Sequence, residues 1–243
     1  MRCSLRHPVG GRLQGGLLQS SKHQILTCLK RQGSSTVDGL AQALGLAPVT
    51  VRQHLTGLQR DDLVETAIVR RSTGRPHYSY RLSRRGEDTF PRRYDRLTET
   101  LLQEISVMDV GELAGLGPEQ RMSLLLRRLS HRLALHYAPQ VQNRPLEERV
   151  AAATEILHAD GGFAEWEQTS GGYEIRDFNC LFHRLLDGDG EGELCEWHRS
   201  FLSRMLGTDV RVVPCSDSST RCCRYLIETV ASERPARPME VAS

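Results

Sequence analysis

The chain has 243 residues, 39% of them hydrophobic, and a formal net charge of +2. This length accommodates one large domain or two ordinary ones. The sequence has no apolar run near the ~18 residues that a membrane-spanning helix needs, and residues 1–16 lack an apolar stretch of signal-peptide length. Composition therefore excludes a membrane-spanning chain, and we expect a cytoplasmic protein whose thiols stay reduced.

Charge divides the chain into a basic and an acidic part. Residues 1–96 hold 17 Lys and Arg against 7 Asp and Glu, a local charge of +10. Residues 97–243 hold 15 Arg against 23 Asp and Glu, a local charge of −8. A basic segment of this kind is typical of phosphate binding, although charge also varies between ordinary solvated surfaces. The pattern inside the basic segment favours nucleic acid.

Three helices are predicted within the basic segment. Ser20 or Ser21 caps the first, Ser35 or Thr36 caps the second, and Pro48 opens the third. Glycine ends the first two helices, where a left-handed residue is favoured. Two helices joined by a tight turn that contains glycine form a helix-turn-helix. Apolar residues recur at helical spacing and are expected to face inward: Ile25, Leu26, Leu29, Val37, Leu40, Ala41, Leu44, Val51, Leu55 and Leu58.

The third helix has the character of a DNA recognition helix. Such helices place their N-terminal residues against base edges in the major groove. Glutamine can pair with adenine and arginine with guanine, whereas threonine and valine can meet a thymine methyl group. Arg60 lies further along the same outer line and suits a phosphate. The residues expected at the bases are Val49, Thr50, Arg52 and Gln53.

A hairpin with an arginine-rich tip follows the third helix. Two predicted strands, 63–69 and 77–82, flank it, and the second alternates Tyr78, Tyr80 and Leu82 on one face. The tip carries Arg70, Arg71 and Arg75, which we expect at DNA, although arginines of this kind also occur in solvated loops.

These residues resemble the winged-helix regulators of the ArsR/DeoR-like group over roughly residues 20–95. The resemblance rests on Val51-Arg52-Gln53-His54-Leu55, on Leu63-Val64-Glu65, and on Gly74-Arg75-Pro76 with Tyr80. It implies DNA binding and leaves open what is sensed. We therefore expect an α+β chain with a winged helix-turn-helix domain at 18–88.

Residues 89–137 are predicted to form a helical linker. A helical pattern starts at about Phe90, and a second helix runs from Pro118 to Tyr137. Long apolar helices beside a winged helix commonly join two subunits at a palindromic site, so we expect a homodimer. The alternative is that the apolar stripes pack within the chain. These stripes consist of Leu97, Leu101, Leu102, Ile105, Met122, Leu125, Leu126, Leu129 and Leu133.

Residues 138–230 are predicted to form a thiol-rich α+β domain, followed by a disordered tail at 231–243. The expected elements are helices at 146–159 and 193–206, a hairpin over 163–177, and strands at 210–214 and 223–228. Five of the seven cysteines lie in the last 64 residues. Cysteines gathered in this way inside cells are more often metal or cluster ligands than disulfides.

Cys180, Cys195 and Cys223 fall at a predicted strand end, the first turn of a helix and a strand start. A helix start favours a thiolate. The chain has no CxxC pair, which argues against zinc ribbons and fingers. Long, unequal spacing is compatible with an iron–sulfur cluster, although scattered core cysteines would give the same pattern.

A closer resemblance concerns the same segment. Asn179-Cys180 with His183, Cys195-Glu196, Phe201-Leu202, Leu206-Gly207-Thr208, Cys215 and Cys222-Cys223-Arg224-Tyr225 resemble the sensor domain of the SufR family. Members of that family are winged-helix repressors of the operon for Suf iron–sulfur cluster assembly. Their first two ligand cysteines are usually slightly closer in sequence than Cys180 and Cys195, and the acidic, Gly-rich residues 187–192 accommodate the difference.

The resemblance to the SufR family implies a ligand set and a mode of regulation. It makes Cys180, Cys195 and Cys223 the cluster ligands, and it favours a four-iron over a two-iron cluster. It also implies that cluster loss relieves repression. The sequence leaves a fourth ligand open among Cys215, His183, Glu196 and His198.

The remaining cysteines are assigned other roles. Cys222 is expected to be structural, because it alternates away from Cys223 on a strand, and Cys28 is expected in a core. The sensor could instead take zinc or a small molecule. The sequence has no nucleophile elbow, P-loop or GxGxxG, so we expect no enzyme.

Overall fold

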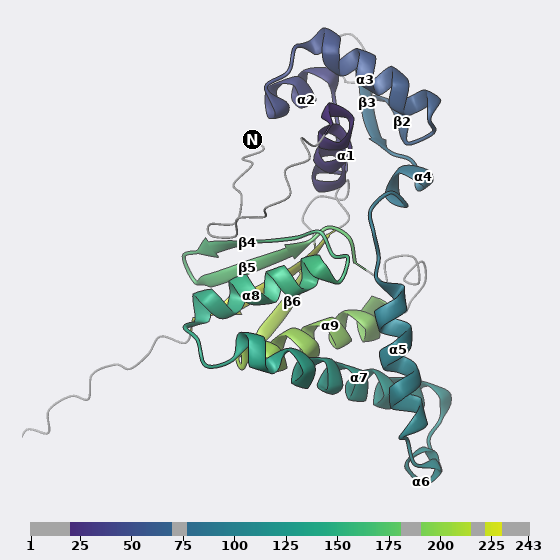
Figure 1. Ribbon diagram of the computed structural model, residues 1–243, viewed down its shortest axis with the longest axis vertical. Helices are drawn as coiled ribbons and strands as arrows, with labels where there is room; N and C mark the ends of the chain where they lie inside the picture. The colour runs from purple at the N-terminus through teal and green to yellow at the C-terminus, as the bar shows by residue number, and fades with distance from the viewer. Residues whose placement is uncertain (1–19, 70–76, 181–190, 215–221, 230–243) are drawn as a thin grey trace, which may run out of the picture.

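The computed structural model of the chain describes residues 20–69, 77–180, 191–214 and 222–229 (Figure 1). Their mixture of helices and antiparallel sheets confirms the α+β class. Several predicted features lie outside the described residues: Arg70, Arg71, Arg75, His183, Cys215 and the tail at 231–243.

The N-terminal domain contains the predicted helix-turn-helix. The Ser20 hydroxyl accepts the His23 amide (3.4 Å), and the Thr36 hydroxyl accepts the Gly39 amide (3.1 Å), so both predicted caps are confirmed. Gly45 ends the second helix in the left-handed region at φ 66°. In chain order the elements are α1 (Ser21–Gln32), β1 (Ser34–Ser35), α2 (Val37–Leu44), α3 (Pro48–Arg60), β2 (Val64–Val69), β3 (His77–Leu82) and α4 (Arg84–Glu87).

A three-stranded antiparallel sheet completes the N-terminal domain in the order β1-β3-β2. The register of β2 with β3 runs from Val64 opposite Leu82 to Val69 opposite His77, which confirms the predicted hairpin. Of the three residues predicted to share one face of the second strand, Leu82 is buried and Tyr80 is half-buried, whereas Tyr78 is 59% exposed at the outer end of the hairpin. The buried core holds most of the predicted inward residues: Ile25, Leu26, Leu29, Leu40, Ala41, Val51, Leu55 and Leu58, with Cys28 among them.

The connection to the second half starts later than predicted. Phe90 is buried in the core of the N-terminal domain, and Pro91 follows it, so the linker helix begins only at Tyr94. A proline disfavours helical geometry at the residue before it. The linker helices are α5 (Tyr94–Ser106), α6 (Val110–Leu113) and α7 (Pro118–Val141).

The C-terminal domain is a four-stranded antiparallel sheet, in the order β4-β5-β7-β6, with helices packed against it. Its core joins apolar residues of α7 and of the domain's own helices to Ile175, Tyr225 and Ile227 of the sheet. Figure 1 shows the first of these helices, α8, lying across the sheet. The elements are α8 (Leu146–Ala159), β4 (Ala164–Thr169), β5 (Gly172–Asp177), α9 (Glu191–Leu206), β6 (Val210–Pro214) and β7 (Cys223–Glu228).

Helix α7 packs inside the chain, largely against α9. Leu126 and Leu129 are buried with Trp197, and the hydroxyls of Ser130 and Ser200 lie 3.3 Å apart. For this face the alternative of internal packing is correct. Met122, by contrast, is 50% exposed. On α5, Leu102 and Ile105 are 61% and 50% exposed, so the predicted apolar stripe of that helix is only partly covered.

One buried carboxylate balances two arginines in the C-terminal sheet. Arg176 on β5 lies directly opposite Arg224 on β7, and like charges in that position destabilise a sheet. Glu174, 4% exposed, accepts from both guanidinium groups, each at 2.7 Å from Nε. The hydrogen bond from Arg224 is the largest cause that lowers the pKa of Glu174 to about 2, and the bond from Arg176 adds to it.

The Glu174 carboxylate should stabilise the fold at neutral pH and lose this effect in acid. Because its folded pKa is depressed, the stabilisation is present above about pH 4.5 and is lost as the pH falls toward about 2. Glu174→Gln should therefore lower the free energy of unfolding by about 2 kcal/mol near neutral pH, after allowance for screening, and by much less near pH 3.

Urea unfolding measures this loss through tryptophan fluorescence, because Trp166 and Trp197, the only two tryptophans, both lie in the C-terminal half. Glu148→Gln, on the exposed side of α8, is the control and should change little at either pH. If Glu174→Gln lowered the free energy of unfolding equally at both pH values, the stabilising effect of the ionised Glu174 carboxylate would be contradicted.

Candidate DNA-binding surface and thiol cluster

The inner side of α3 fixes the direction in which its outer side points. Val51, Leu55 and Leu58 are at most 1% exposed and pack into the N-terminal core. Because these three residues hold one face of the helix, the residues between them must face away from the domain. Figure 1 places α3 at the end of the molecule farthest from α6.

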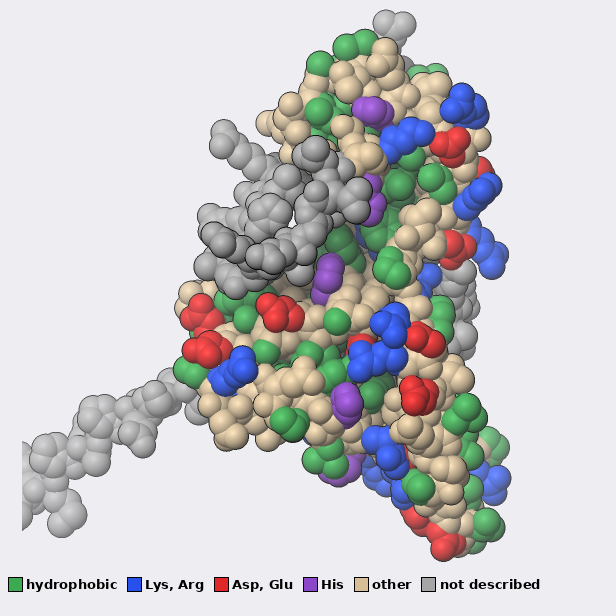
Figure 2. Space-filling view, in the orientation of Figure 1, with side chains coloured by type: hydrophobic (Ala, Val, Ile, Leu, Met, Phe, Trp, Pro, Cys, Tyr) green, Lys and Arg blue, Asp and Glu red, His purple; other side chains and the backbone are tan. Residues whose placement is uncertain are grey.

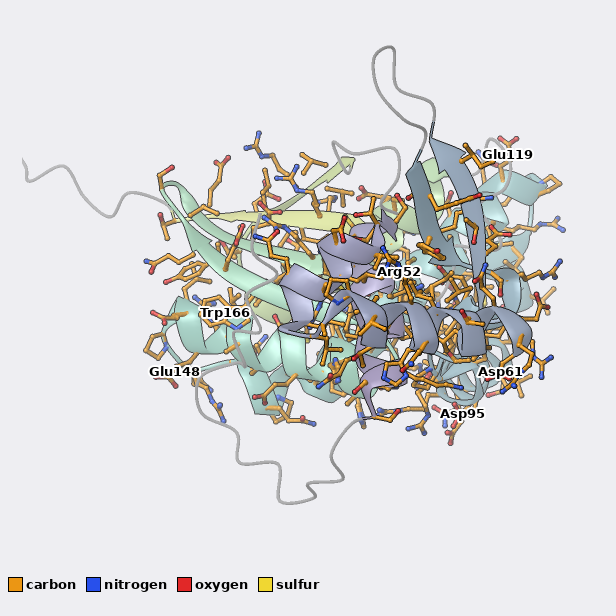
Figure 3. All side chains as sticks on the ribbon, turned by 90° about the horizontal axis from the view of Figure 1, so that it is seen from above. Arg52, Asp61, Asp95, Glu119, Glu148 and Trp166 are labelled. Atoms are coloured by element: carbon orange, nitrogen blue, oxygen red, sulfur yellow. The ribbon has the colours of Figure 1, made fainter. Side chains whose placement is uncertain are left out.

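The predicted base-reading residues lie on the outer side of α3. Val49 is 60% exposed, Arg52 and Gln53 are exposed, and Thr50 is half-buried. Figure 3, which views the molecule from above, shows Arg52 on this helix. The structure therefore brings these four predicted residues together on the first two turns, the part of a recognition helix that enters the major groove.

Arg60 lies at the other end of α3 and suits a phosphate contact. Its side chain is 81% exposed, and its nearest carboxylate, Asp61, lies 3.8 Å away. Asp61 is held by Lys22 of α1 at 3.0 Å, and the hydrogen bond from Lys22 lowers the pKa of Asp61. Since the carboxylate has a closer partner, Arg60 can turn toward DNA without leaving it unpaired.

The described part of the wing adds two exposed residues that were not predicted to lie at DNA. Ile68 and Tyr78 lie opposite each other on β2 and β3 and are 63% and 59% exposed. Two residues directly opposite each other in an antiparallel pair point to the same face, and alternation along the strands does not tell which face meets the core. The arginines predicted for the wing, Arg70, Arg71 and Arg75, lie outside the described residues.

The C-terminal sheet brings two of the predicted ligand cysteines together. Cys223 is the first residue of β7 and lies beside Asp177, the last residue of β5. Cys180 follows Asp177 by three residues. Cys195 comes from α9, which begins at Glu191, so the prediction that Cys195 lies in the first turn is wrong by one turn. The surroundings of Cys195 are therefore those of the other thiols and not those of a helix start.

Cys223 lies close to both of the other thiols. Cys223 hydrogen-bonds through its side chain with both Cys180 and Cys195. The bond with Cys180 is the largest cause that raises the pKa of Cys223 to about 12, and burial and the charge of Asp177 act in the same direction. The structure thus joins residues that are widely separated in sequence, as the prediction required.

An apolar shell borders the thiols, and the donor set fits an iron–sulfur cluster. Cys180, at 9% exposure, packs with Leu126, Leu129 and Trp197, and Cys223 packs against the same group. Among the described residues, no group of three His, Cys, Asp or Glu side chains is placed to hold a metal ion. A cluster is held by separate thiolates in surroundings of limited solvent access, and these three thiols match that chemistry.

The candidates for a fourth ligand differ in their surroundings. Glu196 is exposed and pairs with Arg199, which lowers the pKa of Glu196. His198 is 4% exposed, and burial lowers its pKa against the opposing charges of Asp177 and Cys195. A neutral, buried imidazole beside Cys195 is the better donor of the two. His183 and Cys215 lie outside the described residues.

The remaining described cysteines are not part of this group. Cys28 is 1% exposed in the N-terminal core, as predicted. Cys222 is disulfide-bonded. This agrees with the structural role predicted for Cys222 and differs from the thiol state expected of the cysteines as a group.

Comparison with known proteins identifies the DNA-reading part. Residues 22–70 match the DeoR-like helix-turn-helix domain family. No curated protein and no solved structure matches the chain. With the exposed face of α3 and the hairpin that follows it, the match defines a DNA-binding transcription regulator of the winged-helix kind, which binds double-stranded DNA. Across the part of the chain that the structure describes, no helix combines the length and apolarity needed to cross a membrane.

Substitutions on the outer face of α3 should distinguish residues that contact bases from residues that contact phosphates. Gln53→Ala should weaken binding to a DNA fragment selected from a random pool by about 5–150-fold, and should relax the preference at one base pair. Arg60→Ala should weaken binding to all sequences alike and reduce the slope of log affinity against log salt by about 1.

Fluorescence anisotropy over a range of salt concentrations measures both effects. Arg144→Ala is the matched control, because it removes the same charge from an exposed position in the loop after α7. If Arg144→Ala flattened the salt slope as much as Arg60→Ala, a specific phosphate contact of Arg60 would be ruled out.

Proposed function

We propose that this regulator is a homodimeric, cytoplasmic, iron–sulfur-dependent repressor of genes for iron–sulfur cluster assembly, and that loss of the cluster relieves repression. The observation that carries the proposal is the contact of Cys223 with Cys180 and Cys195, since three thiols from separate elements meet inside a DNA-binding protein. The resemblance of this segment to the SufR family is the basis for proposing cluster-assembly genes as the regulated genes, and it favours a four-iron cluster.

The three cysteines would act as the protein ligands, with His198 as the nearest candidate for a fourth. When bound, a cluster supplies iron–sulfur bonds that respond to oxidants and to iron supply. Ligation keeps the end of β5, the start of β7 and the second turn of α9 in contact. Release of the thiols removes that constraint and leaves the apolar contacts of Leu126, Leu129 and Trp197 to hold the site.

A small-molecule sensor finds little support in the cavity that includes His198. This cavity lies between α5, α7 and α9 and is lined by Arg96, Tyr137, Asp160 and His198. Its volume is about 40 Å³, which is enough for about one water molecule and far below the several hundred Å³ of typical ligand pockets. Arg96 and Tyr137 both bind Asp160 there, so the polar groups satisfy each other. A second hollow, of about 410 Å³, lies at the start of α7 and is lined by Glu119, Gln120 and Arg127 among others.

Iron and sulfide content tests the cluster directly. Protein purified without oxygen should be brown and contain both elements, and Cys195→Ser should lose colour, iron and sulfide, because it removes one of three thiolates. Cys28→Ala is the matched control, since it removes a cysteine from the N-terminal core and should keep the cluster.

Two results would refute the cluster. One is a colourless wild-type protein that contains zinc, which would favour the zinc-responsive alternative. The other is an absence of iron from the wild-type protein even after reconstitution. Neither result would affect DNA binding by the N-terminal domain.

An exposed apolar surface at the end of the linker helices supports a homodimer. Leu102, Ile105, Val107, Val110 and Met122 are 50–83% exposed, and we call them the apolar tip. Figure 2 shows hydrophobic side chains over α5 and α6 at this end. Contiguous exposed apolar surface marks an interaction site, and a second copy would place two recognition helices on a palindromic operator.

Charged groups beside the tip are already paired within the chain, which favours an apolar contact there. Glu104, 3% exposed, accepts from Arg128 and from Arg132, and Arg128 also reaches Glu112 at 2.7 Å. A partner therefore has no buried carboxylate to neutralise at this position.

Substitution of the tip should separate the subunits. The double variant Leu102→Glu with Ile105→Glu should change the mass in solution from twice 27.3 kDa to 27.3 kDa, because it places charges in the apolar contact. Size-exclusion chromatography with light scattering measures the mass. Leu135→Glu, at a 60% exposed position farther along α7, is the control. A dimer that survives the double variant would place the interface elsewhere.

A further inference from the structure

The segment that carries Cys180 also holds the exit of the DNA-binding domain. Asn179 is 2% exposed, and its side-chain amide donates to the carbonyl oxygens of Pro91 (3.0 Å) and Gly161 (2.6 Å). Pro91 directly follows Phe90, which is buried in the N-terminal core. One buried side chain next to a candidate cluster ligand therefore binds the chain where it leaves the DNA-reading domain.

The backbone at this joint is packed too closely for a side chain. Gly161 has φ +91°, and a Cβ atom there would lie 2.8 Å from the Pro91 oxygen and 2.9 Å from the Cα of Arg92. The Arg93 amide donates to the Asp160 oxygen at 3.4 Å. Residues 160–161 and 91–93 thus pass in direct contact, and glycine permits both the conformation and the approach.

Side chains on both sides extend the joint from the linker to α1. The ring of Phe163 lies 5.9 Å from that of Phe90 and 6.2 Å from that of Phe178, the neighbour of Asn179. The guanidinium of Arg31, in the last turn of α1, lies 4.8 Å from the centre of the Phe163 ring and pairs with Glu165 of β4. In Figure 1 the end of α1 accordingly lies above the β4–β5 hairpin.

Asp177 fixes the turn that presents Asn179. Its Oδ1 accepts the amides of Phe163 (3.2 Å) and Asn179 (2.9 Å), and its backbone is paired with Cys223. The turn from Asp177 to Cys180 is therefore bound to the thiol site at both ends and to the DNA-binding domain in its middle.

We propose that Asn179 is a positioning residue that couples the thiol site to the orientation of the winged helix through its hydrogen bonds to Pro91 and Gly161. With Cys180 constrained by its thiol partners, the turn holds Asn179 against Pro91 and fixes the reading domain on the sensor domain. When Cys180 is released, the turn loosens, the two hydrogen bonds weaken, and the reading domain moves more freely. The link to cluster state rests on the function proposed above, whereas the clamp itself does not.

Amide hydrogen exchange at Arg93, in protein purified without oxygen, tests the clamp. Asn179→Ala removes both donors, and Gly161→Ala forces the same backbones apart from the opposite side without touching a thiol. Each should accelerate exchange of the Arg93 amide by about tenfold or more, as loss of local protection does. Gly171→Ala is the matched control, because a Cβ there meets no atom within 4 Å. Wild-type exchange at Arg93 in Asn179→Ala would overturn the proposal even if Gly161→Ala failed to fold.

A second measurement tests the coupling. The ratio of DNA affinities between reconstituted and metal-free protein should fall from about 5–150-fold in wild type toward one in Asn179→Ala, while iron and sulfide content stay at the wild-type level. An unchanged ratio, or a parallel loss of iron, would overturn the coupling role. If wild type itself bound no iron, the proposed function would fail, and exchange at Arg93 would still decide whether Asn179 clamps the linker.

Discussion

The pairing of β5 with β7 is the contact on which the C-terminal half depends. Its register sets Asp177 opposite Cys223, so the chain that leaves β5 must carry Cys180 back across the start of β7. The same register opposes Arg176 and Arg224, a repulsion that Glu174 cancels from within the sheet. A shift by one residue would turn every side chain to the other face, separate the thiols and leave Glu174 without its partners.

The N-terminal domain and the C-terminal half follow each other along the long axis of the molecule and meet at a small number of contacts. The basic N-terminal domain carries the recognition helix at one end, and the linker helices reach the other end (Figure 1). Between them lies the acidic C-terminal half, whose charge is repelled by DNA, so that this half is kept away from the phosphates. The joint around Asn179 and the ion pair of Arg31 with Glu165 are where the halves meet.

Local patterns were sufficient for most of the longer helices and strands but not for what these elements contact. Capping by Ser20 and Thr36, the stop at Gly45 and the bounds of α8, β6 and β7 follow from short-range chemistry and agree with the structure. Helical periodicity identified the apolar stripe of α5 but not that Ile105 stays exposed. The spacing of apolar residues carries no information about which element packs against them. The contact of Asn179 with Pro91 joins residues 88 positions apart. Local sequence patterns do not predict a hydrogen bond over such a separation.

Helix α7 connects the apolar tip to the core of the C-terminal sheet over a long distance. Its 24 residues span about 36 Å as one continuous rod, with exposed Met122 near its start and Val141 buried in the sheet core at its end. In the homodimer proposed above, the apolar tip would be the contact, and α7 would hold the C-terminal sheet at a fixed distance from it. The recognition helices would lie at the end of each molecule farthest from that contact (Figure 1). A small tilt at the contact would therefore become a large displacement at the operator.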